Sequence, residues 1–179
     1  MDVTFFRHGI AVDRADPLAP IDAERPLTLE GKNRAEAAAR GLRNIIAAPS
    51  LIVTSPYRRC LQTARILATA FGLQRRLVRE LDALTPGSSP GRFWGEVAVL
   101  GHPRMLCVGH GGTLEPLAGA ALGLLDPAAA DIGREAAVYG SLHLKKGGAL
   151  HLTVRYEPHL HARLMWLMTP KLLRQLRRS

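Results

Sequence analysis

The amino-acid sequence predicts an α/β layer structure rather than a helical bundle or an all-strand barrel. Short apolar runs of strand length alternate along the chain with longer segments of helical composition, which is typical of α/β layers. Two of the apolar runs end in a histidine between polar or small residues, at Arg7-His8-Gly9 and at Gly109-His110-Gly111. With 179 residues, 47% of them hydrophobic, the chain has enough apolar material for one core. We therefore expect a single domain over residues 1–179.

The first apolar run, Val3 to Phe6, is expected to be a strand that presents Arg7 and His8 at one edge of a sheet. Gly9 allows the chain to turn sharply there. Arginine supplies a forked, permanently charged donor set that fits a phosphate, and a neutral histidine is a nucleophile toward phosphorus. The tripeptide alone is a weak signal, because a strand end with two solvated polar residues has the same sequence pattern.

The next segment, residues 10–26, is rich in proline and aspartate and is expected to form a loop near that edge. Thr28 is predicted to cap a helix from Leu29 to Ala47, which Pro49 ends. Leu51 to Thr54 then predicts a short buried strand.

A serine–proline pair marks the start of the following helix. Ser55 is the expected cap, Pro56 the first helical residue and Phe71 the last. Arg58 and Arg59 fall in the first turn, where free backbone N–H groups and the helix dipole favour an anion. The alternative is a solvated basic face, and we favour that interpretation for Arg58.

The stretch from Thr85 to Gly91 is so rich in turn-forming residues that it predicts a loop. Within it, Gly87 to Gly91 matches the G-x-S-x-G pattern of serine hydrolases, with Ser89 at the nucleophile position. That elbow needs a strand directly before the serine and a helix directly after it. The flanking prolines disfavour both, so we interpret the match as chance.

A helix is predicted over Phe93 to Leu100, followed by a strand over Met105 to Val108. His110 lies just after the end of that strand. If the two histidine-bearing strands are parallel neighbours, both histidines emerge where ligands bind in open α/β sheets. A further helix is expected to begin at Gly112 or Thr113.

The pattern is weaker in the last third of the chain. Val138 to Leu144 and Leu150 to Tyr156 predict two strands, joined by a hairpin-like turn over residues 145–148. Leu160 to Leu176 predicts a last helix, kinked or split at Pro170.

Charge and composition bound the function. The 24 Lys and Arg exceed the 15 Asp and Glu by nine, so anionic partners are favoured. The four Phe, three Tyr and two Trp do not interleave with basic residues, as a stacking platform for single strands requires. A basic nucleic-acid-binding module with an inactive pocket is therefore a distant alternative. The only cysteines, Cys60 and Cys107, do not form a disulfide framework, and neither a secretory leader nor a membrane span is visible, so we expect a cytoplasmic location.

Four residues, Arg7, His8, Arg59 and His110, together supply what phosphoryl transfer requires. One neutral imidazole attacks phosphorus in line, while two guanidinium groups and a second imidazole, expected to be protonated, hold the equatorial oxygens. This chemistry requires no metal and no other cofactor. His159 and His161 have a spacing found in metal sites, but we interpret them as the solvated start of a helix.

An alkyl ester substrate also needs an acid to protonate the leaving group. Glu80 is the best candidate, with Asp82 behind it. The equally weighted alternative is that Glu80 is a surface carboxylate paired with Arg76 or Arg79. A cysteine phosphatase is excluded, because the residue six positions after Cys107 is a threonine and not an arginine.

These motifs resemble the histidine phosphatase superfamily, also called the phosphoglycerate mutase-like family, and within it the small SixA-type phosphohistidine phosphatases. The resemblance covers roughly residues 1–125 and follows the family's order, with Arg7-His8-Gly9, Glu24-Arg25-Pro26-Leu27-Thr28, Thr54-Ser55-Pro56-Tyr57-Arg58-Arg59, Leu84-Thr85-Pro86-Gly87 and Val108-Gly109-His110. It implies a three-layer α/β/α sandwich with a mostly parallel central sheet, His8 as the phosphorylated nucleophile, and Arg7, Arg59 and His110 as the phosphate pocket.

The sequence departs from the larger family members around the acid. Glu80 to Pro86 is closer to the SixA-type pattern, whose members are described as lacking a dedicated acid, and Ile10 replaces the family's usual polar residue after the first motif. We therefore expect a metal-independent, SixA-like phosphatase acting on a phosphorylated substrate such as a histidine-phosphotransfer protein. The alternative is a small-molecule phosphomonoesterase of the same superfamily that uses Glu80 as its acid.

Overall fold

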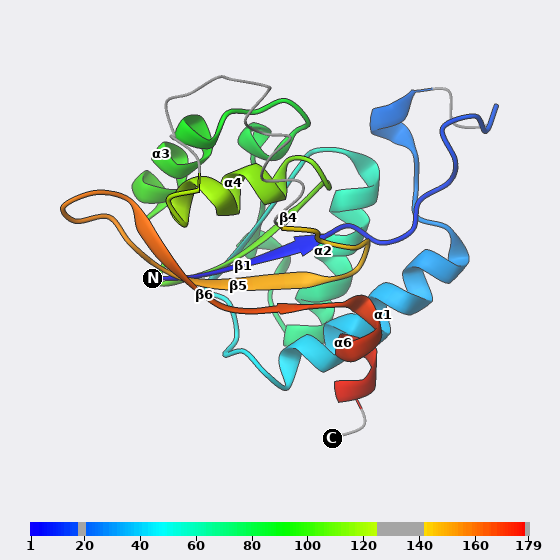
Figure 1. The fold of residues 1–179 in the computed structure, drawn as a ribbon. Helices are drawn as coiled ribbons and strands as arrows, with labels where there is room; N and C mark the ends of the chain where they lie inside the picture. Colours follow the sequence, from blue (N-terminus) through cyan, green and yellow to red (C-terminus); the bar gives the residue numbers. More distant parts are fainter. Residues whose placement is uncertain (18–20, 125–141, 178–179) are drawn as a thin grey trace.

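The computed structural model of the chain describes residues 1–17, 21–124 and 142–177. Its centre is a six-stranded sheet with the strand order β3-β2-β4-β1-β5-β6 (Figure 1). The strands are β1 (Asp2–Arg7), β2 (Leu51–Thr54), β3 (Val78–Glu80), β4 (Arg104–Gly109), β5 (Ala149–Arg155) and β6 (His161–Met168). The strands β1 to β4 pair in parallel, while β5 and β6 are antiparallel to their neighbours. The sheet is thus mixed, with the parallel pairings in the majority, and the expected α/β fold is confirmed.

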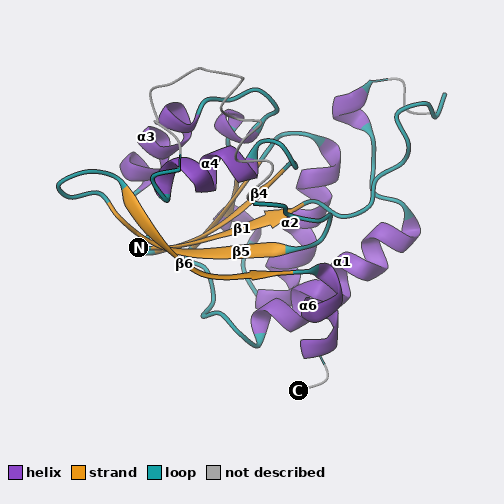
Figure 2. Cartoon of the chain, viewed as in Figure 1, coloured by secondary structure: helices purple, strands orange, loops and turns teal. Residues whose placement is uncertain are grey.

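Helices cover both faces of the sheet (Figure 2). One face carries α1 (Leu29–Arg43), α2 (Arg58–Phe71) and α6 (Pro170–Leu176), and the other carries α3 (Pro90–Leu100) and α4 (Leu114–Ala121). The three expected layers are therefore present. In the part of the chain that the structure describes, no helix is long and apolar enough to cross a membrane.

Strand β1 shows how the sequence builds two cores from one sheet. Successive side chains of a strand point to opposite faces. Phe5 packs in the cluster under α3 and α4, and Phe6 packs in the cluster under α1 and α2. Both side chains are fully buried, and each contributes about 1.5–3 kcal/mol of burial free energy. The strand is fixed between two apolar layers, and its last residue reaches the sheet edge.

The helix boundaries differ from the predicted ones by a few residues. Thr28 caps α1 by accepting from the amide of Gly31, as expected. The helix ends at Arg43 rather than Ala47, because the amides of Asn44 and Ile45 already bond three residues back. This tighter turn closes the helix before Pro49 is reached.

The caps of α2 and α3 also differ from the prediction, and both differences involve a serine. The cap of α2 is Tyr57, and the hydroxyl of Ser55 is turned into the candidate site instead. Helix α3 begins at Pro90 and not at Phe93, with Ser89 as its cap accepting from the amide of Arg92. A Ser–Pro start signal therefore operates here, where the sequence predicted a loop, and it explains Ser89 without a catalytic role.

The predicted last helix, Leu160 to Leu176, is wrong in its first half. Residues 161–168 form β6, the edge strand paired with β5. A bulge opposite His151 and Leu152 switches the faces of β6, so that Ala162 packs with one core and Trp166 with the other. Pro170 begins α6, with Thr169 as its cap. The bulge breaks the two-residue alternation that would have predicted a strand from the sequence.

The predicted turn over residues 145–148 is present, with the amide of Gly148 donating to the carbonyl of Lys145, but it does not join the two predicted strands as a hairpin. Residues 138–141 lie outside the described residues, and Leu142 to Leu144 do not form a strand. The backbone groups of Leu144 are used elsewhere, since its amide donates to Glu115 and its carbonyl accepts from Arg7. Strand β5 instead pairs with β1 and β6.

Candidate active site

The carboxyl ends of β1, β2 and β4 lie side by side and bring the predicted site residues together. Arg7 is opposite Gly109 in the parallel β1–β4 pair, so the next residue of β1, His8, and the residue after β4, His110, are neighbours. Their ring centroids are 5.2 Å apart. The structure thus places both histidines on one edge of the sheet, as the sequence predicted.

His8 is held in one tautomer. Its Nδ1 is 2.7 Å from the carbonyl oxygen of Gly9, and because a carbonyl only accepts, Nδ1 carries the proton. The lone pair is therefore on Nε2, which accepts from Nε of Arg59 at 3.2 Å. The side chain is 5% exposed. Burial, together with the nearby His110, Arg59 and Arg7, holds the pKa of His8 well below its usual range, although the Gly9 hydrogen bond opposes this.

Arg59 is the most connected side chain of the site. It enters from the first turn of α2 and is 2% exposed. Its guanidinium group bonds Nε2 of His8 and Nδ1 of His110, at 3.2 and 3.1 Å, and both the carbonyl and the carboxylate of Asp22. Its neighbour Arg58 is exposed, in agreement with the solvated face expected for it. A buried, rigidly held fork of this kind matches a phosphate group.

His110 has the opposite tautomer to His8. Arg59 only donates, so Nδ1 of His110 accepts, and Nε2 donates to the hydroxyl of Ser55 at 2.9 Å. Burial and then the charge of Arg59 lower the pKa of His110 to about 3. The expectation of a protonated second imidazole is therefore not met in this structure, where His110 is neutral.

Arg7 lies against the backbone of Gly111, where a Cβ atom would be 2.3 Å from the Arg7 guanidinium carbon. One nitrogen of Arg7 donates to the carbonyl of Leu144 at 2.7 Å. Its Nε is buried and has no hydrogen-bond partner among the described residues. An unsatisfied buried donor is costly, so Arg7 is a donor available to an anion.

A buried carboxylate fixes the segment that holds Arg7. Glu115, in the first turn of α4, is 3% exposed. It accepts from the amides of Gly112 and Leu144, at 2.7 and 3.2 Å. Glu115 thereby ties the turn after His110 to the residue whose carbonyl accepts from Arg7. Glu115 was not predicted from the sequence, because its partner Leu144 is 29 residues away in the chain.

These side chains border a hollow of about 470 Å³. It is predominantly cationic and is lined by Arg7, His8, Ala11, Asp13, Arg14, Arg25, Arg59, Pro86, His110, Gly111 and Lys146. Within the described ranges, no three His, Cys, Asp or Glu side chains are grouped so that they could hold a metal ion. The hollow can hold a phosphoryl group between two arginines, with an uncharged imidazole nitrogen beside it.

Asp22 is the second residue that sequence analysis missed. Its carboxylate pairs with Arg14, Arg25 and Arg59. Burial alone would raise the pKa of Asp22, but the hydrogen bond and charge of Arg59, with Arg25 and Arg14, lower it. An aspartate two residues before the motif Glu24-Arg25-Pro26-Leu27-Thr28 was the available signal. Asp22 holds the outer side of the Arg59 fork.

Glu80, the predicted acid, is not brought into this cluster. It is the last residue of β3, is exposed, and does not line the hollow. None of the ion pairs among the described residues joins it to Arg76 or Arg79. Its role as an acid therefore stays a prediction.

The two cysteines are both buried and free. Cys60 lies beside the site, with its sulfur 3.5 Å from Nε2 of His110. Burial raises its pKa to about 12. Burial also raises the pKa of the Cys107 thiol, far above its ordinary value. Neither sulfur is a thiolate near neutral pH, so both act as small apolar side chains.

Solved structures of similar fold include the protein histidine phosphatase SixA complexed with tungstate, with a TM-score of 0.78, 21% identity and coverage of 97% of this chain and 99% of that one. They also include mycobacterial glucosyl-3-phosphoglycerate phosphatase with inorganic phosphate, with a TM-score of 0.68, 20% identity and coverage of 95% and 98%. These likenesses concern the fold.

Sequence comparison goes further. An uncharacterized protein of Picosynechococcus sp. (strain ATCC 27264 / PCC 7002 / PR-6) is 34% identical over 186 residues, covering 97% of this chain and 99% of its own. The family model of the histidine phosphatase superfamily (branch 1) matches residues 3–99, more than half of the chain. The matched region contains Arg7, His8 and Arg59. This chain therefore belongs to branch 1 of the histidine phosphatase superfamily and is a phosphatase.

Proposed function

We propose that this phosphatase takes the phosphoryl group onto Nε2 of His8 and that its substrate is phosphohistidine on a protein. The observation that carries the proposal is the tautomer of His8. Its Nδ1–H donates to the carbonyl of Gly9, so the lone pair is on Nε2, where Nε–H of Arg59 donates to it. A nucleophile and its charge-stabilising donor are thus aligned before a substrate binds.

In the first step, Nε–H of Arg59 releases Nε2 of His8 and turns to a phosphoryl oxygen. The freed Nε2 lone pair forms a bond to phosphorus while the bond from phosphorus to the leaving group breaks. The leaving group departs with that electron pair. Arg59 and Arg7 offer donors to the equatorial oxygens, including the unpartnered Nε of Arg7. The dianionic phosphoryl group also adds negative charge beside His110 and raises its pKa, so that this imidazole becomes a better donor to the same oxygens.

In the second step, a water oxygen forms a bond to phosphorus and the bond from phosphorus to Nε2 breaks. Its electron pair returns to Nε2, and inorganic phosphate leaves with the oxygen of water. The Nδ1–H of His8 stays on the Gly9 carbonyl throughout. The P–N bond is labile enough for water to complete this step.

The nature of the leaving group favours a phosphohistidine substrate. An imidazole leaves with less need for an acid than an alkoxide does. Among the described residues, Asp22 is engaged with three arginines and Glu80 does not line the hollow. Asp13 does line it, but its Oδ1 accepts from the amide of Ala15. None of these three carboxylates is therefore set up as an acid for an alkoxide. The fold likeness to the protein histidine phosphatase SixA supports the same substrate class.

A substrate comparison tests the proposal. The parent chain, His8→Ala and the exposed-site control His161→Ala are given a phosphohistidine-bearing phosphotransfer domain and p-nitrophenyl phosphate, with EDTA present. We expect hydrolysis of the phosphoprotein by the parent and the control, and a loss of roughly 10⁴-fold or more in His8→Ala. Equal activity of His8→Ala would overturn the mechanism.

The alternative is a small-molecule phosphomonoesterase that uses Glu80 as acid, and the fold likeness to glucosyl-3-phosphoglycerate phosphatase favours it. Activity on the ester alone would move the assignment there. In that case Glu80→Gln lowers kcat on alkyl esters by roughly 10²-fold or more. Glu36→Gln, at an exposed carboxylate of α1 that does not line the hollow, serves as its control. No hydrolysis of either substrate would favour the distant alternative, a basic nucleic-acid-binding module with an inactive pocket.

A further inference from the structure

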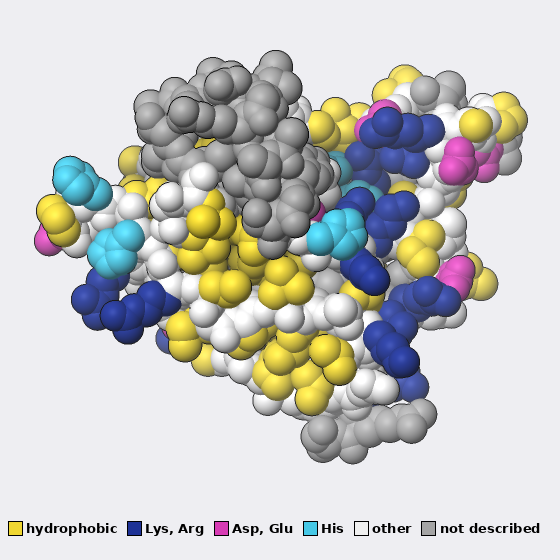
Figure 3. All heavy atoms as spheres, viewed as in Figure 1, with side chains coloured by type: hydrophobic (Ala, Val, Ile, Leu, Met, Phe, Trp, Pro, Cys, Tyr) yellow, Lys and Arg dark blue, Asp and Glu magenta, His cyan; other side chains and the backbone are white. Residues whose placement is uncertain are grey.

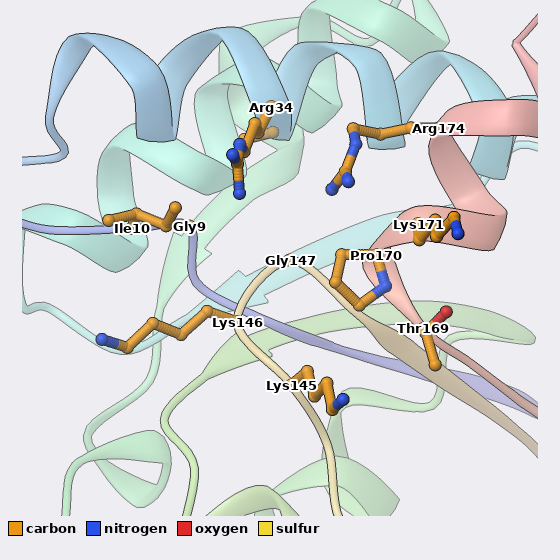
Figure 4. Close-up of a pocket in the computed structure, with 11 residues that line it drawn as sticks. Gly9, Ile10, Arg34, Lys145, Lys146, Gly147, Thr169, Pro170, Lys171 and Arg174 are labelled. Atoms are coloured by element: carbon orange, nitrogen blue, oxygen red, sulfur yellow. The ribbon is translucent and has the colours of Figure 1, made fainter.

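A second hollow, of about 390 Å³, lies next to the active site between α1, the turn at residues 145–147 and the start of α6 (Figure 4). Its lining includes five cationic side chains and no acidic one. Arg34 extends from α1 and Arg174 from α6 into the same space above Gly147. The other three cations are Lys145, Lys146 and Lys171.

These charges are largely uncompensated within the protein. Arg34 pairs with Glu30 one turn earlier on α1, an exposed pair. No ion pair of the described residues involves Lys145, Lys146, Lys171 or Arg174. Like charges gathered in one concave space repel each other, and an anion placed among them removes that cost. The forked arginines fit a carboxylate or a phosphate better than a diffuse surface would.

The hollow is joined to the active site both in space and through the backbone. Lys146 lines both hollows, and Gly9, which follows the nucleophile, lines this one. The amide of Gly147 lies within hydrogen-bond distance of the carbonyls of Arg7 and His8, at 3.0 and 3.2 Å. The lysine-bearing turn is therefore fixed to the strand end that carries the nucleophile. Figure 3 shows Lys and Arg side chains as a band along one side of this face, which reaches from the loop near the active site to α1 and α6.

We propose that this hollow binds a second oxyanion, a carboxylate or a phosphate, of the same substrate whose phosphoryl group goes to His8. The inference rests on the proposed function and adds a specificity site to it. The oxyanion has two sources: an acidic side chain close to the phosphohistidine of a protein, or a second phosphate of a small molecule. In both cases, the guanidinium groups of Arg34 and Arg174 bind the oxyanion, and Lys146 lies between the two hollows.

The test compares two double variants, one that removes two positive charges from this hollow and one that removes two positive charges elsewhere on the surface. Arg34→Gln/Arg174→Gln is compared with Arg65→Gln/Arg75→Gln, in which two exposed arginines outside both hollows are changed. The substrates are a phosphohistidine-bearing phosphotransfer domain, propane-1,3-diol bisphosphate, its monophosphate and p-nitrophenyl phosphate. We expect the first double variant to raise KM roughly tenfold for the phosphoprotein or the bisphosphate. Its kcat, and its KM for both monophosphates, should match the control.

The two arms identify the source of the oxyanion. If KM rises only for the phosphoprotein, the second oxyanion is an acidic side chain of a protein substrate. If KM rises only for the bisphosphate, it is the second phosphate of a small molecule. If the phosphoprotein is not hydrolysed at all, the proposed function fails, while the bisphosphate arm still tests the hollow. If nothing is hydrolysed, affinities of the same ligands for His8→Ala, with and without the Arg34 and Arg174 changes, replace KM. The proposal is overturned if the two double variants behave alike, or if single-anion ligands lose as much as the others.

Discussion

At the residue scale, one guanidinium group organises the site. Arg59 donates to Nε2 of His8 and to Nδ1 of His110, while Asp22 holds its outer side. The two imidazoles therefore have opposite tautomers, since Nδ1–H of His8 donates to the carbonyl of Gly9 and Nε2–H of His110 donates to the hydroxyl of Ser55. Only a forked donor reaches all of these partners together, so the site depends on the shape of the arginine as well as on its charge.

Substitution of Arg59 by lysine separates shape from charge. Lysine keeps the positive charge but cannot donate to both imidazoles and to Asp22 at the same time. We expect Arg59→Lys to lower kcat/KM by roughly 10²–10³-fold, the typical loss for one oxyanion donor. Arg58→Lys is the matched control, because its side chain is exposed at the adjacent position. Steady-state kinetics on p-nitrophenyl phosphate check this, and equal activity of the two variants would contradict the role of the fork.

Much of this site could be predicted from the sequence. Arg7, His8 and His110 each follow an apolar run and a glycine is adjacent, which is local information. Arg59 was identified from its place in the first turn of the helix predicted after Ser55 and Pro56. Asp22 and Glu115 were missed, because one partner of each, Arg59 and Leu144, is 37 and 29 residues away in the chain. The protonation of His110 was mispredicted, since desolvation by the finished fold decides it.

At the element scale, strands fully buried between two helical layers were predictable and edge elements were not. The runs that became β1, β2 and β4 are continuously apolar because helices cover both of their faces. Strand β6 lies at the sheet edge and is mostly exposed, and its bulge removes the alternation. Helix α6 is short and depends on its contact with α1. Helix α6 forms one wall of the second hollow, and its position is set by packing against α1.

That contact is tight at one glycine. A Cβ atom on Gly41 of α1 would be 1.7 Å from the carbonyl oxygen of Leu173 in α6, so the two backbones touch. We expect Gly41→Ala to push α6 away and to lower the free energy of unfolding by about 1–3 kcal/mol, the usual cost of overpacking. Urea denaturation measures this.

Gly95 of α3 provides the matched control, because nothing lies within 4 Å of a Cβ atom there. Alanine in the middle of a helix is more favourable than glycine by about 0.5–1 kcal/mol. Gly95→Ala should therefore stabilise the protein. If Gly41→Ala does so as well, the close approach of α1 and α6 is incorrect.

At the scale of the whole molecule, the fold holds uncharged histidines inside a basic protein. The formal net charge is +9, yet His8 and His110 are nearly buried, and half-buried His151 also has a lowered pKa, mainly through burial. The charged form of each is disfavoured in the folded state alone. Folding and protonation are therefore linked.

The linkage predicts acid sensitivity with a definite sign. In the unfolded chain a histidine has a pKa of about 6.5, above the lowered pKa values of His8 and His110 in the fold. Below pH 6.5 the unfolded state binds more protons than the folded state. The contribution of the two neutral histidines to the free energy of unfolding is therefore complete above that pH, and it is lost as the pH falls from 6.5 toward 3. For His110 alone, the free energy of unfolding should drop by about 2 kcal/mol between pH 7.5 and pH 5.

Urea denaturation at these two pH values checks the linkage. The pKa of Asp22 is lowered from an ordinary value already below this window, so its titration does not contribute. His110→Asn should make the free energy of unfolding less dependent on pH than in the parent. A parent protein equally stable at both pH values would contradict the neutral, buried state of the two histidines.

The central claim is that the phosphoryl group passes through His8, and trapping the intermediate tests it most directly. The parent is mixed with p-nitrophenyl phosphate and quenched in alkali, because phosphohistidine is labile in acid. Peptide mass spectrometry then locates the phosphoryl group. We predict one phosphoryl group on the peptide that contains His8, and none in His8→Ala. A phosphoryl group on His110 or on another residue, or turnover by the parent without any phosphorylated peptide, would contradict the account.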